Sequence, residues 1–273
     1  MPTTYTHYRF GKDVLSCLSL PLRNSILEKR ELYDIGLHGP DIFFYYKAMH
    51  NNPVNQIGYR IHDRNASEFF LNAKKMIEKS PDKAAARAYL YGFVCHFVLD
   101  SICHPYIEKM EKTSGLSHSE IEMEFDRTLL IEDHYDPLTY PMTRHIHPTK
   151  ENAAILTPFF GNVTDQEVQK AMKGMIFYHK FFQLQNDNAR KLLFLGMKLT
   201  KIYDNCHGMV MSKEPNPNCF NYCLLLKKLY AEAISTAASL IRRYQDVLFD
   251  KAELPARFEQ TFGAGDHWEQ LPL

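Results

Sequence analysis

Two imidazoles and a carboxylate recur at every fourth residue in one apolar segment of the chain. The segment YGFVCHFVLDSICHPYIE, residues 91–108, contains His96, Asp100 and His104. Residues four apart on an α-helix lie on the same face, so these three side chains would project in one direction. Imidazole nitrogens and carboxylate oxygens are standard Zn²⁺ ligands. Because a buried carboxylate without a partner is destabilising and a metal ion offsets that desolvation, the spacing predicts a metal-binding helix face.

A second pair of the same residue types follows after a short loop. Ser117 and Glu120 have the spacing of a capping box, which predicts a new helix with His118 in its first turn. Glu122 follows His118 by four residues and therefore shares its face of the helix. Three imidazoles and two carboxylates thus fall within residues 96–122. The alternative interpretation is a buried hydrogen-bonded network of the same side chains without a metal.

Three further residues are candidates to join these helices, each on a weaker signal. Asp41 stands at an expected helix start, where the helix dipole alone favours an acidic residue. His7 lies near the start of the chain, and His62 lies just before an amphipathic segment. Each of the three also has a purely structural explanation.

Helical periodicity accounts for most of the chain, and strand patterns are almost absent. The sequence therefore predicts a single all-α domain over residues 1–273. The long apolar helix is expected to have Ser80 as its N-cap and to end near His104, because Pro105 disfavours helical geometry in the residue before it. The expected helices cover residues 21–36, a stretch from 40, 65–80, 81–104, a stretch from 118, 164–183, 187–204 and 222–249.

The segment 133–148 is rich in Pro, His and Tyr and predicts an ordered loop or a lid. Its two histidines near the end, His145 and His147, are expected at the surface, with proton donation to a leaving group as the alternative. The aromatic run 43–46 is expected to lie mostly in the core, with some rings as candidates for a cleft wall.

Composition excludes several classes of protein. Apolar residues make up 45% of the chain, which is enough for a substantial core and argues against disorder. Lys and Arg number 32, as do Asp and Glu, so the net charge of zero carries no nucleic-acid signature. The chain shows no secretory h-region and no apolar run that could span a bilayer, so the expected location is the cytoplasm. The oligomeric state cannot be read from the sequence.

Four motifs resemble the zinc-dependent phospholipase C family, which is related in fold to the S1/P1-type nucleases. They are MPTTYTHYRFG, GLHGPDIFFYY, GFVCHFVLDSICHPYIE and HSEIEMEFD, and the resemblance covers roughly residues 3–127. It implies an all-α fold with a trinuclear zinc cleft that cleaves phosphodiesters.

The resemblance also implies which side chains bind the metal ions. His96 and Asp100 match the family's His-x3-Asp pair, and His118 and Glu122 match its His-x3-Glu pair. The implied ligands for two or three Zn²⁺ ions are His7, Asp41, His62, His96, Asp100, His104, His118 and Glu122.

These ligands would divide into three groups, with Asp100 bridging two zinc ions. His50 is the alternative to His62 as the ligand that follows Asp41, because the spacing from Asp41 differs from the family's spacing for both histidines. Secreted members begin with a Trp whose amine and carbonyl bind zinc, whereas this chain begins Met-Pro-Thr-Thr. The interval from Asp100 to His104 is also shorter than in the secreted enzymes. The implied groups are Asp41, His62, His96 and Asp100; His7 and Asp100; and His104, His118 and Glu122.

The ligand set implies the chemistry of phosphodiester hydrolysis. Zn²⁺ lowers the pKa of a bound water to about 7, so hydroxide is available as the nucleophile at neutral pH. Asp41 is the candidate catalytic residue, as ligand, as general base, or as both. The substrate would be a phospholipid head group or another phosphodiester.

Two other functions remain open at this stage. His62 and Asp63 resemble the His-Asp pair of HD-domain metallophosphohydrolases, in which Asp63 would be a ligand, but this interpretation leaves the 96/100/104 series unexplained. The second is a non-catalytic helical protein that a metal cluster stabilises. A structural zinc site is closed by protein ligands, whereas a catalytic one keeps a position for water, so an open site would separate these functions.

Overall fold

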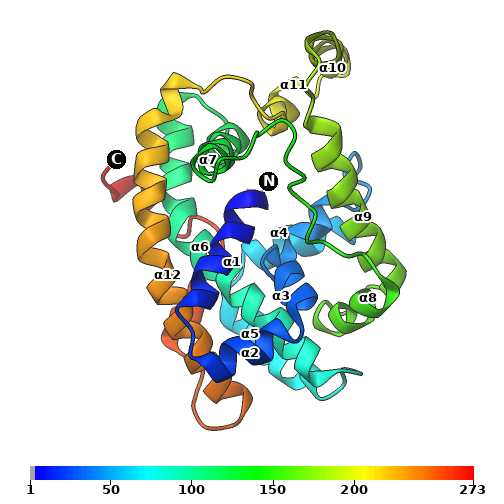
Figure 1. Cartoon of the computed structure of the whole chain (residues 1–273), viewed down its shortest axis with the longest axis vertical. Coiled ribbons are helices and arrows are strands. Elements are labelled where there is room, and N and C mark those ends of the chain that lie inside the picture. Colours follow the sequence, from blue (N-terminus) through cyan, green and yellow to red (C-terminus); the bar gives the residue numbers. More distant parts are fainter. Residues whose placement is uncertain (1–3) are drawn as a thin grey trace.

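The structure, a computed structural model, describes residues 4–273, apart from the side chain of Asn205, and is built from α-helices (Figure 1). Within those residues there is no β-strand, only an isolated bridge between Asn65 and Thr261. The predicted all-α fold is confirmed. The α-helices are α1 (Thr4–Ser16), α2 (Leu20–Leu27), α3 (Arg30–Gly36), α4 (Asn55–His62), α5 (Ala66–Ile77), α6 (Lys83–Ser114), α7 (His118–Glu132), α8 (Lys150–Leu156), α9 (Asp165–Phe182), α10 (Asp187–Leu199), α11 (Tyr203–Cys206) and α12 (Phe220–Leu248).

The central helix α6 is longer than the sequence predicted. It does not end near His104 but continues through Pro105 to Ser114, so that prediction was wrong. A proline inside a helix costs about 3 kcal/mol, and the side chains beyond it, Ile107 and Met110, are buried in the core and offset this cost. The start also differs: the N-cap is Asp82, not Ser80, because the Asp82 carboxylate accepts a hydrogen bond from the backbone N–H of Ala85.

The predicted helix over 21–36 is in fact two helices, α2 and α3, separated at residues 28–29. The break lets α3 lie directly against α6. A Cβ on Gly36 would stand 2.1 Å from the carbonyl oxygen of Tyr89, and one on Gly92 would stand 2.1 Å from that of Tyr33. Only glycine fits at both positions, so this pair sets how closely the two helix backbones approach.

The segment that follows α3 forms a 3-10 helix, η1 (Gly39–Tyr45), where the sequence predicted a helix from residue 40. Phe43, Tyr45 and Tyr46 are buried, as expected for most of this aromatic run. Phe44 is partly buried and faces a cleft described below.

Several boundaries in the second half agree with prediction, and one does not. The helix α7 begins after Ser117, with the predicted capping box to Glu120 present. The expected helix 187–204 divides into α10 and α11. The C-terminal segment after α12 runs back along α6 and contributes Phe258 and Phe262 to the main core (Figure 1).

The loop between α7 and α8 holds a buried histidine that the sequence placed at the surface. His145 is only 5% exposed, stacks on Tyr8 and lies with its Nε2 2.7 Å from Nε2 of His38. Burial lowers the pKa of His145 to about 3, so it is neutral at physiological pH. His147 is exposed, as predicted. The surface prediction for His145 was wrong because packing against α1 and the segment after α3 decides its burial.

Among residues 4–273, no helix combines the length and the apolar character that crossing a bilayer requires.

Candidate metal centre

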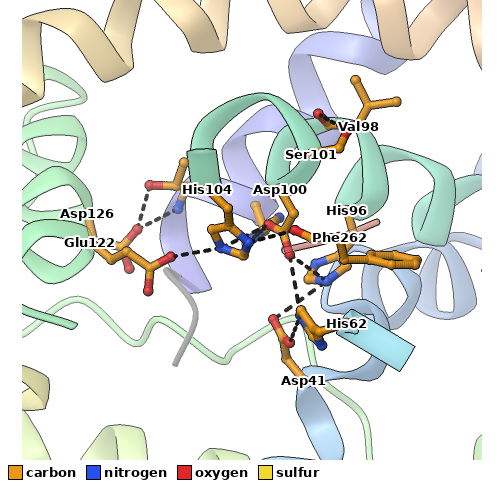
Figure 2. Close-up of polar contacts among 12 residues, drawn as sticks. Asp41, His62, His96, Val98, Asp100, Ser101, His104, Glu122, Asp126 and Phe262 are labelled. Carbon is orange, nitrogen blue, oxygen red and sulfur yellow. Dashed lines mark hydrogen bonds and ion pairs between the residues drawn. The ribbon is translucent and has the colours of Figure 1, made fainter. Parts of the chain in front are cut away.

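Five separate parts of the chain bring the predicted ligands together, and Figure 2 labels Asp41, His62, His96, Asp100, His104 and Glu122 among them. The helix α6 is the common support, because three of these residues stand on it one turn apart. The others come from α1, η1, the last residue of α4 and the first turns of α7. By element, the residues are His7 (α1), Asp41 (η1), His62 (α4), His96, Asp100 and His104 (α6), and His118 and Glu122 (α7).

The first group of ligand atoms is buried. His7, Asp41, His96 and Asp100 are all buried, and one ligand atom from each lies within 4.8 Å of the others. His62 joins them, with its Nε2 at 3.1 Å from Oδ1 of Asp41 and 3.6 Å from Oδ2 of Asp100. The geometry thus gathers three imidazoles and two carboxylates around one point.

The second group lies beside the first and is more open. His104, His118 and Glu122 again have ligand atoms within 4.8 Å of one another. Oε1 of Glu122 is 3.4 Å from Nε2 of His104 and 3.2 Å from Nε2 of His118. His104 also lies 3.9 Å from Oδ1 of Asp100, which therefore stands between the two groups. The side chain of His118 is 30% exposed, so this group can be reached from solvent.

The buried atoms of the first group fit metal ions better than a hydrogen-bonded network. Both oxygens of Asp41, Nε2 of His96 and Oδ2 of Asp100 are buried and make ion-pair contacts with one another or with His62, but none of these contacts has hydrogen-bond geometry. Such atoms are rare in folded proteins unless a ligand satisfies them. Two tetrahedral zinc ligands, each about 2.0–2.2 Å from the ion, are about 3.3 Å apart. The N–O distance of 3.1 Å between His96 and Asp100 is close to that separation.

The approach of η1 to α6 depends on a glycine. Gly39 has φ 48°, and a Cβ there would stand 2.1 Å from Cδ2 of His96. A side chain at residue 39 would push the His96 ring away from Asp41, which follows Gly39 by two residues in the chain. The absence of a side chain therefore allows the two ligands on different elements to meet.

Two backbone carbonyls fix the orientation of the imidazoles. Nδ1 of His62 lies 2.8 Å from the carbonyl oxygen of Gly58, and Nδ1 of His104 lies 2.7 Å from that of Phe262. Each Nδ1–H donates to its carbonyl, so Nε2 is the atom that faces the carboxylates and that would bind a metal ion after losing its proton. This arrangement is typical of histidines that bind metal ions.

The C-terminal segment therefore belongs to the centre, although nothing in its sequence indicated this. The ring of Phe262 packs against those of His62 and His96, with centroids 5.7 and 5.9 Å apart. The N–H of Gly263 donates to the carbonyl oxygen of His62 at 3.3 Å. A backbone carbonyl leaves no pattern in a sequence, so no motif analysis could have found this contact.

A buried carboxylate on α7 holds the helix that carries His7. Asp126 accepts hydrogen bonds from the backbone N–H groups of Tyr5 and Thr6, at 3.0 and 2.7 Å, and from the Thr6 hydroxyl. The first N–H groups of a helix have no partner within it, so this carboxylate satisfies the start of α1. His7 lies one residue further on, with its Nε2 3.1 Å from Oδ1 of Asp100. Residues 1–3, where this chain differs from the secreted members that begin with Trp, lie outside the described part of the chain.

Charge within the cluster shifts the pKa values of its members strongly. Burial lowers the pKa of His62, but the carboxylates of Asp41 and Asp100 outweigh this and raise that pKa to about 10. Burial likewise lowers the pKa of His104, and Asp100 outweighs it, so that pKa rises to about 9. Burial raises the pKa of Asp100, yet neighbouring imidazoles, His96 foremost, hold it well below its usual value. The imidazoles thus keep Asp100 ionised, in the state that a cation needs.

A cleft of about 230 Å³ opens at the second group. Its polar side carries ligands of both groups, and Phe44 and Tyr59 form an aromatic wall with ring centroids 4.6 Å apart. Glu108, which sequence analysis missed, also lines the cleft; it continues the spacing of four from His96, Asp100 and His104. The lining residues are Asp41, Phe44, Tyr59, His62, His104, Glu108, His118, Glu122, Gly263 and Ala264.

Two residues that were alternative candidates for metal ligands lie away from the metal centre. His50 is exposed, and its backbone carbonyl accepts hydrogen bonds from the side chains of Asn52 and Asn55. Asp63, the expected ligand in an HD-domain protein, is also exposed. Neither belongs to a group of clustered ligand atoms in residues 4–273.

Comparison with known proteins agrees with this geometry. Searches of curated proteins and of solved structures gave no match. A family model described as zinc dependent phospholipase C matches residues 6–174, which is more than half of the chain and includes every residue of both groups. The chain belongs to the zinc-dependent phospholipase C family, a family of metal-dependent hydrolases.

Proposed function

We propose that this protein is a zinc-dependent phosphodiester hydrolase whose substrate is a phospholipid head group or a related phosphodiester. One observation carries the proposal: buried ligand atoms of Asp41, His96 and Asp100, which make no hydrogen bond of good geometry, converge next to an open cleft. When bound, zinc would supply an acidified water as nucleophile and positive charge for the phosphate oxygens. The eight side chains described above would hold two or three such ions.

The remaining steps fall to residues of the chain. Asp41 belongs to the first group and also lines the cleft, and these two positions support a role for its carboxylate in taking a proton from the attacking water. Phe44 and Tyr59 would hold the alcohol part of the substrate against the aromatic wall, and Glu108 at the same cleft would favour a cationic substituent. His145 does not line the cleft, so it would not donate a proton to a leaving group there.

The two competing functions have weaker support. A metal cluster that only stabilises the fold would be closed by protein ligands, whereas the second group opens into the cleft through His118. The HD-domain interpretation needs Asp63 as a ligand, and this side chain is exposed. The single-domain organisation and the cytoplasmic location stay predictions.

Metal analysis combined with a substrate panel tests the proposal. The purified protein should contain at least two zinc ions per chain and should release phosphomonoester from a phospholipid or a water-soluble phosphodiester. Chelation should abolish turnover, and added Zn²⁺ should restore it. Protein that holds less than one zinc ion, or that hydrolyses no phosphodiester when fully loaded, would show the proposal to be wrong.

A further inference from the structure

The two most exposed large apolar side chains among the described residues both lie on α10. Leu199 is 76% exposed and Leu192 is 70% exposed, and Leu195 between them is 54% exposed. Positions i, i+3 and i+7 of a helix share one face, so the three leucines form a continuous stripe. Single exposed leucines need no explanation, but an aligned stripe marks a surface that binds something apolar.

The stripe is not needed to hold α10 in place, because the opposite face does that. Met197 is buried there with Phe182 and Val210 in a small hydrophobic cluster separate from the main core. Arg190 donates hydrogen bonds to the carbonyl oxygens of Leu184 and Met211, at 3.1 and 2.6 Å. The helix is thus anchored on one side and presents leucines on the other.

Positive charge accompanies the leucines. Lys191 and Lys198 are exposed beside the stripe, and Lys201 is exposed just beyond the helix end. The acidic residue of this helix, Asp187, is already paired with Lys213 at 2.5 Å. An exposed apolar stripe flanked by exposed lysines complements a surface with negative head groups above an apolar interior.

A second copy of the chain fits this surface less well. A symmetric dimer across α10 would bring Lys191 and Lys198 of one copy against the same lysines of the other. Like charges at such a contact oppose association. The charge pattern therefore favours an anionic lipid surface over self-association.

The position of α10 connects the stripe to the metal centre. The short segment that follows α10 packs on the first turn of α7: Nε2 of His207 lies 3.3 Å from Oε2 of Glu120, and a Cβ on Gly208 would touch Ser119. That same turn carries His118, which lines the cleft. Figure 1 shows α10 at the top of the molecule, on the side of α7 and α9.

We propose that α10 docks the protein on anionic phospholipid membranes by inserting its leucine stripe, which brings the cleft to its substrate. This inference rests on the proposed function, because a phospholipid substrate is what requires contact with a membrane. Burying an exposed leucine in an apolar phase lowers its free energy enough to change a partition coefficient by about tenfold.

Co-sedimentation with vesicles tests the docking surface directly. Vesicles would be phosphatidylcholine with or without phosphatidylserine, and binding would be read before any head group is released. The wild type should bind the phosphatidylserine vesicles more strongly, and added salt should weaken this binding. The triple variant Leu192→Gln/Leu195→Gln/Leu199→Gln should bind at least about 100-fold more weakly.

Two further variants separate the contributions and keep folding under control. Lys191→Gln/Lys198→Gln keeps the leucines and should lose mainly the preference for phosphatidylserine. Leu20→Gln is the matched control: Leu20 is 63% exposed on α2, at the opposite end of the molecule in Figure 1, and its loss should leave binding unchanged. Equal melting temperatures would show that all variants are folded.

The outcomes distinguish this inference from the proposed function. Failure of the wild type to bind any vesicle, or equal binding by the triple variant and the wild type, would overturn the docking surface. Wild-type dimerisation that the triple variant lacks, without vesicle binding, would replace the membrane by a second copy. Turnover of a water-soluble phosphodiester without vesicle binding would refute only the docking surface, whereas vesicle binding without any turnover would refute only the proposed function.

Discussion

Replacing Asp100 by Asn should remove metal ions while leaving the helix intact. Asp100 stands between the two ligand groups, with imidazole nitrogens at 3.1 Å (His7), 3.1 Å (His96) and 3.9 Å (His104). Asn has nearly the same shape but no charge, so the change removes the central anion without creating a cavity. The helix should persist because α6 is buried against other elements on both sides of this position.

The size of the effect follows from the number of ligands. Zinc sites with four protein ligands have apparent binding free energies of about 10–16 kcal/mol, or about 3 kcal/mol per ligand. Since 1.4 kcal/mol corresponds to a factor of ten, losing one charged ligand should weaken each ion that Asp100 contacts by about 100-fold. Two ions would be affected if Asp100 bridges them, and one if it does not.

Zinc titration under a competing chelator, with metal counting, measures this loss. Asp34→Asn is the matched control, because Asp34 is a buried carboxylate that pairs with Arg30 at 2.6 Å outside the cluster. The control should bind as much zinc as the wild type. If Asp100→Asn retains the full zinc content, affinity and turnover of the wild type, the central role of this carboxylate is wrong.

Four further predictions concern the same centre. In the metal-free protein, the pKa of His62 is about 10 and that of His104 is about 9, so zinc must displace protons from both at neutral pH. Zinc affinity should therefore rise with pH towards about 9. Calorimetry in buffers of different ionisation enthalpy would detect the released protons, and a zinc affinity that does not change with pH would contradict the prediction. The same raised pKa values stabilise the metal-free fold fully below about pH 6.5, and this contribution should be lost as the pH rises through about 9 to 10. Asp126→Asn should lower the free energy of unfolding by about 3 kcal/mol in urea titrations, because three hydrogen bonds at the start of α1 lose their charged acceptor. An unchanged midpoint of urea unfolding would show that this carboxylate does not hold α1. Gly263→Pro removes the N–H that donates to the His62 carbonyl and disturbs Phe262, so zinc affinity should fall about tenfold. Circular dichroism should show that the fold is retained. A variant with wild-type zinc affinity would exclude a role for the C-terminal segment.

The sequence by itself determined the local features of this protein. The spacing of four along residues 96–104 follows from helical geometry alone, so the shared face could be read without a structure. The capping box of Ser117 and Glu120 is likewise satisfied within one turn. The all-α class followed from periodicity, and the family followed from motifs contained in single segments. Each of these signals depends on residues that are close together in the chain.

Tertiary structure decided which distant segments meet. The choice of His62 over His50 at the cluster depends on where α4 packs, and the spacing after Asp41 did not settle it. The continuation of α6 past Pro105 depends on core contacts that outweigh a local helix preference. The Phe262 carbonyl that orients His104 is a backbone group 158 residues away in the chain. Helix propensity and hydrophobic periodicity reflect interactions between residues that are close in the chain. The contacts named above depend instead on tertiary packing, such as the close approach of α3 and α6 at Gly36, and no local sequence pattern encodes that packing.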